Sequence, residues 1–265
     1  VLIITTSGTA TAELYPSIIE AYQNRVPLII CTADRPAYLR NTGANQTINQ
    51  DNIYKNHIRF FYDTGLPKLA AKNIKSLKEN IVKAFKISWL QDCGPVHLNF
   101  PFEKPLEPDS ITDNIDESII SIALPIKFSL DKNVTNIDSS QKNISALNLW
   151  LKKNCCGLIT VGPGNFSDRF INLLENFSAK FALPIFADAS SGLSFRSNSI
   201  TNLITNFDAI LRTESFSDFF SPKLNFHFGR AATSPRLNEF LSKSKSKRFI
   251  VNRFGDMIDS SKSST

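Results

Sequence analysis

The sequence has no apolar run close to the roughly 20 residues that a membrane-spanning helix needs. Its opening residues, Val1 to Ile4, lack the basic flank and the small-residue cleavage site of a secretory signal peptide. With 42% hydrophobic and 20% charged residues in a chain of 265, the composition is that of a soluble globular protein with one or two cores. We therefore expect a cytoplasmic protein without a membrane span, most simply built from two domains.

Cysteine and histidine are scarce, and their positions argue against two kinds of site. The cysteines show no metal-ligand spacing, so we expect buried or idle thiols and no metal site in this chain. No histidine has a serine or cysteine partner by sequence, which argues against a catalytic triad. The residues concerned are Cys31, Cys93, Cys155, Cys156, His57, His97 and His227.

The chain also lacks a concentrated charge of one sign, although its net charge is +6 and its pI is about 9.1. Lysine and arginine are scattered, except for a basic run between Lys243 and Arg248 just before an apolar strand pattern. A solvated loop explains that run better than a nucleic-acid site does, so we expect no nucleic-acid partner.

An initiator methionine is absent as well. The sequence begins within an apolar run typical of a strand and ends in a polar Ser/Lys stretch, where an α/β unit is expected to continue. We interpret the sequence as an internal piece of a longer protein.

Strand and helix patterns alternate in two blocks, which predicts an α/β fold of two doubly wound parallel-sheet domains. The boundaries are a first domain at 1–106, a linker at 107–140 rich in Pro, Asp, Ser and Asn, and a second domain at 141–265. Strands are predicted at 1–4, 28–31, 58–62, 96–100, 157–161, 184–187, 224–228 and 248–252. Helices are predicted at 9–23, 71–90, 142–153, 166–180, 202–213 and 235–243.

Polar segments follow two strands of the first domain, at the edge where open α/β sheets bind ligands. Ser7, Gly8 and Thr9 open a helix whose amides can meet an anion or a polar ring edge, but ordinary capping explains them too. Arg35 is held extended by the following proline and can present its planar fork to a carboxylate. A pair with Asp34 that only holds the loop explains Arg35 equally well.

A long polar loop at 37–56 contains Asn45 and Gln46, whose amides can contact an oxoacid or an aminopyrimidine. Such amides more often satisfy loop backbone. In the second domain, the turn at 162–164 has two glycines but lacks the third of a dinucleotide fingerprint, so a plain turn is favoured. Arg230 and Arg236 flank the loop after the strand at 224–228, as anion contacts or as solvated surface residues.

Taken together, several segments resemble one family in order and spacing. They are Thr6-Ser7-Gly8-Thr9-Ala10, Ala33-Asp34-Arg35-Pro36, Gly43-Ala44-Asn45-Gln46 and Gly94-Pro95-Val96-His97-Leu98-Asn99, followed by Pro101-Phe102 and Pro105-Leu106. They are similar to the synthase family of menaquinone and phylloquinone biosynthesis that makes 2-succinyl-5-enolpyruvyl-6-hydroxy-3-cyclohexene-1-carboxylate. The resemblance is specific up to about residue 106 and looser beyond, where the chain looks like the family's central domain.

The resemblance implies a transferase that uses thiamine diphosphate and Mg²⁺ to decarboxylate 2-oxoglutarate and join the product to isochorismate. It implies that residues 1–106 are the carboxyl-terminal part of a pyrimidine-binding domain, within a homodimer or homotetramer. The family's activating glutamate is expected upstream of Val1, and its metal and diphosphate motif downstream of Thr265. This chain alone is therefore expected to be inactive.

By matching positions, the resemblance implies that Arg35 binds a substrate carboxylate and that Asn45 and Gln46 orient the reacting species, with Gln46 in a catalytic role. It places Ser7, Gly8 and Thr9 beside the aminopyrimidine of the cofactor.

In the central domain the family has a lysine where this sequence has Pro235, so the anion contact would fall to Arg236. The alternatives are another thiamine-diphosphate enzyme, of the acetohydroxyacid synthase or 2-oxoacid decarboxylase type, and a non-catalytic nucleotide-binding module.

Overall fold

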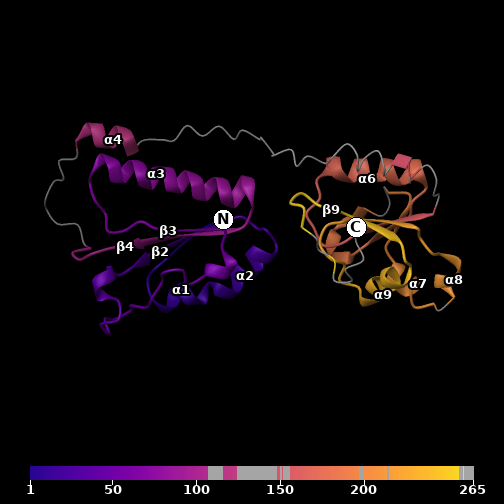
Figure 1. Ribbon diagram of the computed structural model, residues 1–265, viewed down its shortest axis with the longest axis horizontal. Coiled ribbons are helices and arrows are strands. Elements are labelled where there is room, and N and C mark those ends of the chain that lie inside the picture. Colours follow the sequence, from indigo (N-terminus) through magenta and orange to yellow (C-terminus); the bar gives the residue numbers. More distant parts are fainter. Residues whose placement is uncertain are drawn as a thin grey trace. The chain divides into compact units, whose positions relative to one another are not determined.

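A computed structural model describes residues 1–106, 116–123, 148–149, 151, 156–196, 200–213, 215–256 and 259. The chain divides into two compact units, Val1–Asn136 and Ile137–Thr265. Each unit is built on one parallel sheet with helices on both of its faces (Figure 1). The predicted fold class, α/β with two doubly wound parallel sheets, is confirmed.

The first unit has a four-stranded sheet in the order β1-β2-β4-β3. Its strands are β1 (Leu2–Thr5), β2 (Leu28–Asp34), β3 (Phe60–Asp63) and β4 (Pro95–Pro101). Its helices are α1 (Thr9–Glu13), α2 (Tyr15–Gln23), α3 (Ala71–Lys86) and α4 (Glu117–Ala123), with 3-10 turns at Ala37–Leu39 and Lys55–His57.

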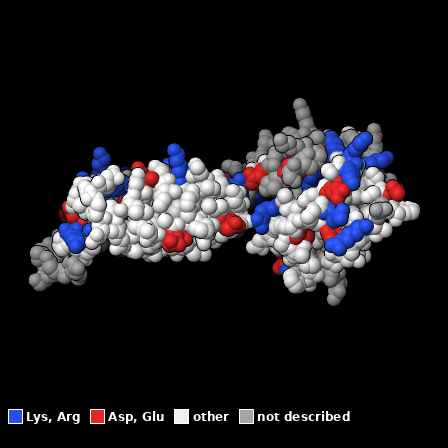
Figure 2. Space-filling model, turned by 90° about the horizontal axis from the view of Figure 1, so that it is seen from below, with Lys and Arg blue, Asp and Glu red and all other residues white. Residues whose placement is uncertain are grey.

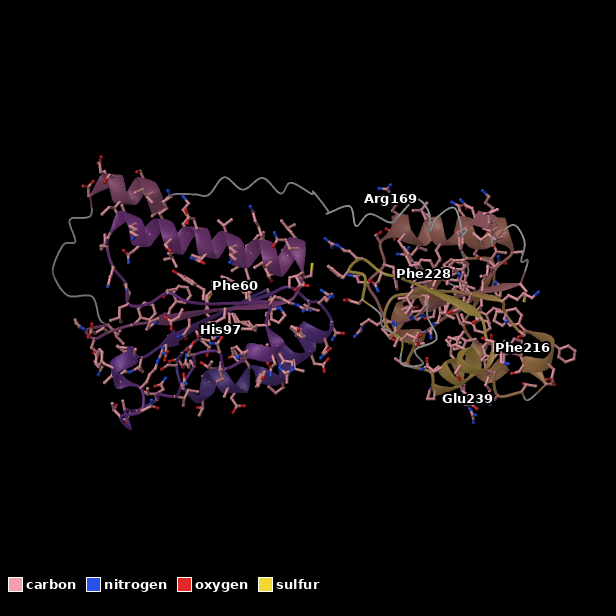
Figure 3. All side chains as sticks on the ribbon, viewed as in Figure 1. Phe60, His97, Arg169, Phe216, Phe228 and Glu239 are labelled. Carbon is pink, nitrogen blue, oxygen red and sulfur yellow. The ribbon has the colours of Figure 1, made fainter. Side chains whose placement is uncertain are left out.

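Apolar side chains on both faces of this sheet form its core. On one face α2 packs on β2 through Ile18 and Ile30, which are fully buried, and on the other α3 packs on β4 through Ala84 and Val96. Polar residues interrupt β4, because His97 and Asn99 alternate with the apolar residues and are themselves fully buried. Figure 3 labels His97 beside the sheet of the first unit.

The second unit has a five-stranded sheet in the order β7-β6-β5-β8-β9. Its strands are β5 (Gly157–Val161), β6 (Ile185–Ala187), β7 (Leu203–Ile204), β8 (Leu224–Phe228) and β9 (Lys247–Val251). Its helices are α6 (Asp168–Phe181), α7 (Phe207–Ile210), α8 (Phe216–Phe219) and α9 (Pro235–Lys243), with 3-10 turns at Ala189–Ser191 and Leu193–Arg196. In Figure 1, α6 covers one face of the sheet, and α7, α8 and α9 lie on the other.

Two predicted helices need correction, and one helix, α4, was not predicted. The helix predicted at 202–213 is wrong, because Leu203 and Ile204 pair with β6 as the short strand β7, and only α7 follows. The helix predicted at 71–90 ends at Lys86 and continues as a π-helical turn, Ile87–Gln91. The predicted linker contains α4, whose Ile122 carbonyl accepts a hydrogen bond from Lys78 of α3.

The helix predicted at 142–153 lies largely outside the described residues, as does most of the linker. No described helix combines the length and the hydropathy of a bilayer-spanning segment. Within the same residues, no group of three or more His, Cys, Asp or Glu side chains is placed to hold a metal ion, and Cys31, Cys93 and Cys156 are free thiols.

Candidate functional site

The carboxyl ends of the strands in the first unit bring together the two segments that the sequence singled out. The turn after β1 carries Ser7 and Gly8, and the loop after β2 carries Gln46. The Ser7 hydroxyl donates to the Gln46 carbonyl (3.0 Å). The Gln46 side-chain amide donates to Thr6 Oγ1 (2.8 Å) and to the Ser7 carbonyl (3.2 Å). These contacts join the predicted cofactor segment to the predicted catalytic residue.

Glycine is required at position 8 by both conformation and space. Gly8 has a φ of +83°, and a Cβ there would come within 3.1 Å of the Gln46 side chain and carbonyl. Its amide, which we expected to meet an anion or a ring edge, donates to Gln50 Oε1 at 2.8 Å. The first residue of α1 is Thr9, and no side chain caps this helix, so the capping alternative is not what the structure shows.

The hydrogen bonds of Gln46 fix which way its amide faces. Because both partners of its Nε2 accept, the nitrogen points at the β1 turn and Oε1 is left without a hydrogen bond to any described residue. Asn45 and Thr9 are exposed beside it. The edge of the sheet therefore presents an oriented amide oxygen next to exposed polar side chains.

Arg35 has its backbone fixed and its side chain unused. Its amide donates to Asp34 Oδ1 (2.8 Å), while its guanidinium makes no hydrogen bond or ion pair with any described residue, and its Nε is buried without a partner. The expected alternative, in which Asp34 pairs with the Arg35 side chain, is therefore not what the structure shows. A guanidinium in this state is suited to an anionic ligand.

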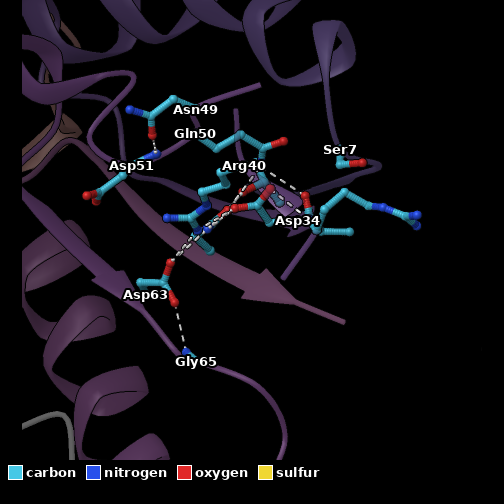
Figure 4. A network of polar contacts seen from close by, with 12 residues as sticks. Ser7, Asp34, Arg40, Asn49, Gln50, Asp51, Asp63 and Gly65 are labelled. Carbon is cyan, nitrogen blue, oxygen red and sulfur yellow. Dashed lines mark hydrogen bonds and ion pairs between the residues drawn. The ribbon is translucent and has the colours of Figure 1, made fainter. Parts of the chain in front are cut away.

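Arg40, which the sequence did not single out, forms the ion pair with Asp34 that we considered for Arg35 (Figure 4). Its Nη2 contacts Asp34 Oδ2 at 2.7 Å and Asp63 Oδ2 at 3.2 Å. Asn99 Nδ2 donates to the same two carboxylates, at 2.9 and 3.0 Å. Burial opposes the charge on Arg40, but the two carboxylates outweigh it and raise the pKa of Arg40.

Buried side chains extend this network back to the β1 turn. Asn99 Oδ1 accepts from Thr32 Oγ1 (2.8 Å) and from Gln50 Nε2 (3.0 Å), and Gln50 Nε2 also donates to the Ala33 carbonyl (2.9 Å). The carboxylates and the Gly8 amide leave both amides only one possible orientation. One continuous network thus connects Gly8 with Asp34.

The same network assigns the tautomer of His97. The single hydroxyl hydrogen of Thr32 goes to Asn99 Oδ1, so the contact of 2.7 Å between Thr32 and His97 Nε2 needs the hydrogen on the imidazole. His97 Nδ1 is then a buried lone pair without a partner. Burial, opposed in part by Asp63, lowers the pKa of His97 to about 4, so the ring is neutral at pH 7.

In the second unit, the turn at 162–164 contacts the loop that follows β8. A Cβ at Gly162 would lie 1.8 Å from the Arg230 carbonyl, and the Arg230 amide donates to the Pro163 carbonyl at 2.9 Å. Asp188 joins the end of β6 to the loop after β8, because it accepts from Thr233 N (2.7 Å) and Thr233 Oγ1 (2.5 Å). The loop thus packs directly on the glycine turn, in agreement with a plain turn.

Arg236 lies in the first turn of α9, where Ser234 caps the helix and Pro235 takes its first position. Its guanidinium pairs with Glu239 at 3.3 Å, and its side chain is 58% exposed. Basic and acidic atoms are mixed over the visible face of this unit (Figure 2). Within the second unit, the contacts of Arg236 are those of a surface residue.

Comparison with known proteins identifies relatives along nearly the whole sequence. The chain is 32% identical to the 2-succinyl-5-enolpyruvyl-6-hydroxy-3-cyclohexene-1-carboxylate synthase of Haloquadratum walsbyi over 259 residues, covering 96% of this chain and 41% of that protein. The synthases of Crocosphaera subtropica and Bacillus cytotoxicus are 32% and 31% identical, covering 98% and 95% of this chain and 44% and 42% of theirs. All three relatives carry this one synthase name, so the chain is similar to this synthase family along nearly its whole length.

The chain spans less than half the length of the curated relatives that it matches. No protein-family model matches it. Among solved structures, it resembles a thiamin diphosphate-dependent enzyme of Mycobacterium smegmatis with a TM-score of 0.58 and 15% identity, covering 99% of this chain and 46% of that one. That likeness concerns the fold, and it agrees with the two parallel sheets described above.

Proposed function

We propose that the complete protein carrying this sequence is a transferase that joins 2-oxoglutarate, with loss of CO₂, to isochorismate in menaquinone or phylloquinone biosynthesis. The names of the relatives support the synthase. The observation that carries the proposal for this site is the unused guanidinium of Arg35, because a substrate with carboxylates needs such a partner.

We propose that the first unit contacts the pyrimidine half of thiamine diphosphate, which when bound supplies the electron sink for the decarboxylation. Ser7, Gly8 and Thr9 would lie beside it: the Ser7 hydroxyl and the Gly8 amide, which bond to Gln46 and Gln50, would fix the shape of the turn, and the exposed Thr9 would face the ring. The Gln46 amide oxygen, fixed in direction, would accept a hydrogen bond from a donor of the ring or substrate. Following the family resemblance, we propose that Mg²⁺ and the diphosphate are held outside this chain.

The roles of Asn45 and Arg236, the localisation and the oligomeric state are proposed from the family resemblance. We propose that Asn45 lines the substrate pocket, since it is exposed beside Gln46, and that Arg236 contributes an anion contact from the central domain. We also propose that the complete protein is cytoplasmic. We propose that it is a homodimer or homotetramer, and sedimentation equilibrium of that protein tests this oligomeric state.

The test is a steady-state assay of the complete natural protein with Mg²⁺, thiamine diphosphate, 2-oxoglutarate and isochorismate. We expect Arg35→Ala to lose about 2 to 3 kcal/mol of transition-state stabilisation, which is roughly 30- to 150-fold in kcat/KM. Arg212→Ala is the control, because Arg212 forms only a surface pair with Asp208. We expect it to leave kcat/KM unchanged.

Each outcome decides a separate part of the proposal. If the wild-type protein turns over another 2-oxoacid but not 2-oxoglutarate, the substrate assignment is wrong and an acetohydroxyacid synthase or decarboxylase type of reaction replaces it. If Arg35→Ala retains full kcat/KM, the role of Arg35 is wrong. The nucleotide-binding alternative is disfavoured, because the Arg230 carbonyl fills the space at Gly162.

A further inference from the structure

Arg40 closes a short loop that begins at the predicted substrate-binding residue. The segment from Arg35 to Arg40 turns back through the 3-10 turn Ala37–Leu39, in which the Leu39 amide donates to the Pro36 carbonyl (2.9 Å) and the Arg40 amide to the Ala37 carbonyl (3.1 Å). Both ends of the segment then meet one carboxylate: Asp34 Oδ1 accepts from the Arg35 amide (2.8 Å), and Asp34 Oδ2 accepts from Arg40 Nη2 (2.7 Å).

The Asp34 carboxylate is held in place by Arg40 and Asn99. Its side chain is fully buried, with 0% exposure, and it meets Asp63 at the same two donor atoms, Arg40 Nη2 and Asn99 Nδ2. Arg40 supplies the only positive charge that the structure places on this pair of carboxylates within the described residues. Without that charge, two carboxylates would face each other across one amide, and repulsion would drive them apart.

A movement of Asp34 would reach Arg35 directly, because Asp34 Oδ1 is the acceptor of the Arg35 amide. The Arg35 guanidinium makes no hydrogen bond or ion pair with a described residue, so within that part of the chain no polar partner fixes its direction. The direction of the Arg35 side chain therefore depends on the conformation of its backbone, which the hydrogen bond to Asp34 fixes.

We propose that Arg40 is a positioning residue that, through Asp34, aims the Arg35 guanidinium at the substrate carboxylate. This inference rests on the proposed function, in which Arg35 binds that carboxylate. Arg40 itself touches neither substrate nor cofactor in this proposal. Its contribution to the reaction should vanish when the Arg35 guanidinium is absent, whereas a contribution to folding alone should not.

A double-mutant cycle on kcat/KM in the complete protein tests this dependence. We expect Arg40→Met to lower kcat/KM about 10-fold in the wild-type background, mainly through KM, and less than about 2-fold in the Arg35→Ala background. Arg40→Lys should recover to within about 3-fold of wild type, because one ammonium can meet both carboxylates. Arg212→Met, which removes an exposed arginine from the surface pair with Asp208, is the matched control and should have no effect.

Two results would overturn the inference. One is an equal loss from Arg40→Met with and without Arg35, and the other is a loss that Arg40→Lys does not reduce. If Arg40→Met does not fold, the same substitution is made in an Asp63→Asn background, where the repulsion is absent and we expect less than about a 2-fold loss of kcat/KM relative to Asp63→Asn alone. A loss of about 10-fold in that background would also contradict the inference. A wild-type protein without synthase activity contradicts the proposed function instead, so the two failures are distinguishable.

Discussion

Two buried imidazoles, those of His97 and His227, each bond to a threonine of the neighbouring strand. His97 Nε2 lies 2.7 Å from Thr32 Oγ1, and His227 Nδ1 lies 2.9 Å from Thr160 Oγ1. The other nitrogen of His227 donates to the Arg230 carbonyl at 2.8 Å. Burial is the main cause that lowers the pKa of each ring to about 4.

Stability should therefore decrease as the pH falls from about 6.5 to about 4. In this window the unfolded chain binds a proton at each histidine and the native state does not, so protons favour unfolding. We expect each histidine to cost about 2 kcal/mol between pH 7 and pH 5. Urea unfolding of the first unit, followed through Trp89 in a Trp150→Phe background, measures the contribution of His97.

The variant His97→Gln should reduce the pH dependence of that transition by about 2 kcal/mol. The control is His227→Gln, whose ring lies in the second unit and should leave the first transition unchanged. An unaltered pH dependence in His97→Gln would show that this ring is not the titrating group.

At the scale of elements, the turn after β5 and the loop after β8 are in backbone contact. The Gly162 amide donates to the Phe228 carbonyl at 2.9 Å, and the Arg230 carbonyl occupies the position that a Cβ at Gly162 would need. Neither segment can move without the other. The contact holds the loop that leads to Ser234 and α9.

We expect Gly162→Ala to destabilise the second unit by about 3 kcal/mol or more, because the added methyl group meets backbone that cannot rotate away. Gly164→Ala is the matched control, since the nearest atoms to its Cβ would belong to the Phe166 side chain, 2.6 Å away, rather than to backbone, and we expect a smaller loss. Hydrogen exchange of the β5 and β8 amides measures both effects. Equal protection in the two variants would contradict the expected rigidity.

The elements that the sequence predicted well have strong local signals. The strands at 157–161 and 224–228 and the helix at 235–243 are confirmed, and all three have clear apolar patterns with glycine, proline or serine at an end. The helix at 202–213 was wrong because Leu203 and Ile204 acquire strand partners only in the folded sheet.

The candidate site was predictable in part for the same reason. Ser7, Gly8 and Gln46 lie in segments with recognisable patterns, and the fold brings them together. Arg40 and Asp63 had no local signal, because their contact depends on the spatial order of β2, β4 and β3. The alternation of His97 and Asn99 with apolar residues in β4 was the one sign of a buried network.

At the scale of the whole molecule, the two units each have their own sheet and core. Contacts cluster within Val1–Asn136 and within Ile137–Thr265. We expect two separate unfolding transitions in calorimetry of this chain, and we expect Gly162→Ala to lower the midpoint of only one. A single transition, shifted as a whole by that variant, would show that the units unfold together.

The closed network of Thr32, Gln50 and Asn99 has a consequence for the divergence of the chain during evolution. Each amide hydrogen and the threonine hydrogen has an acceptor, and each amide oxygen has a donor. Replacing one member leaves another buried and unsatisfied, at a cost of about 1 to 3 kcal/mol. These three positions should therefore change together or remain as they are. We expect correlated substitutions at them among homologues.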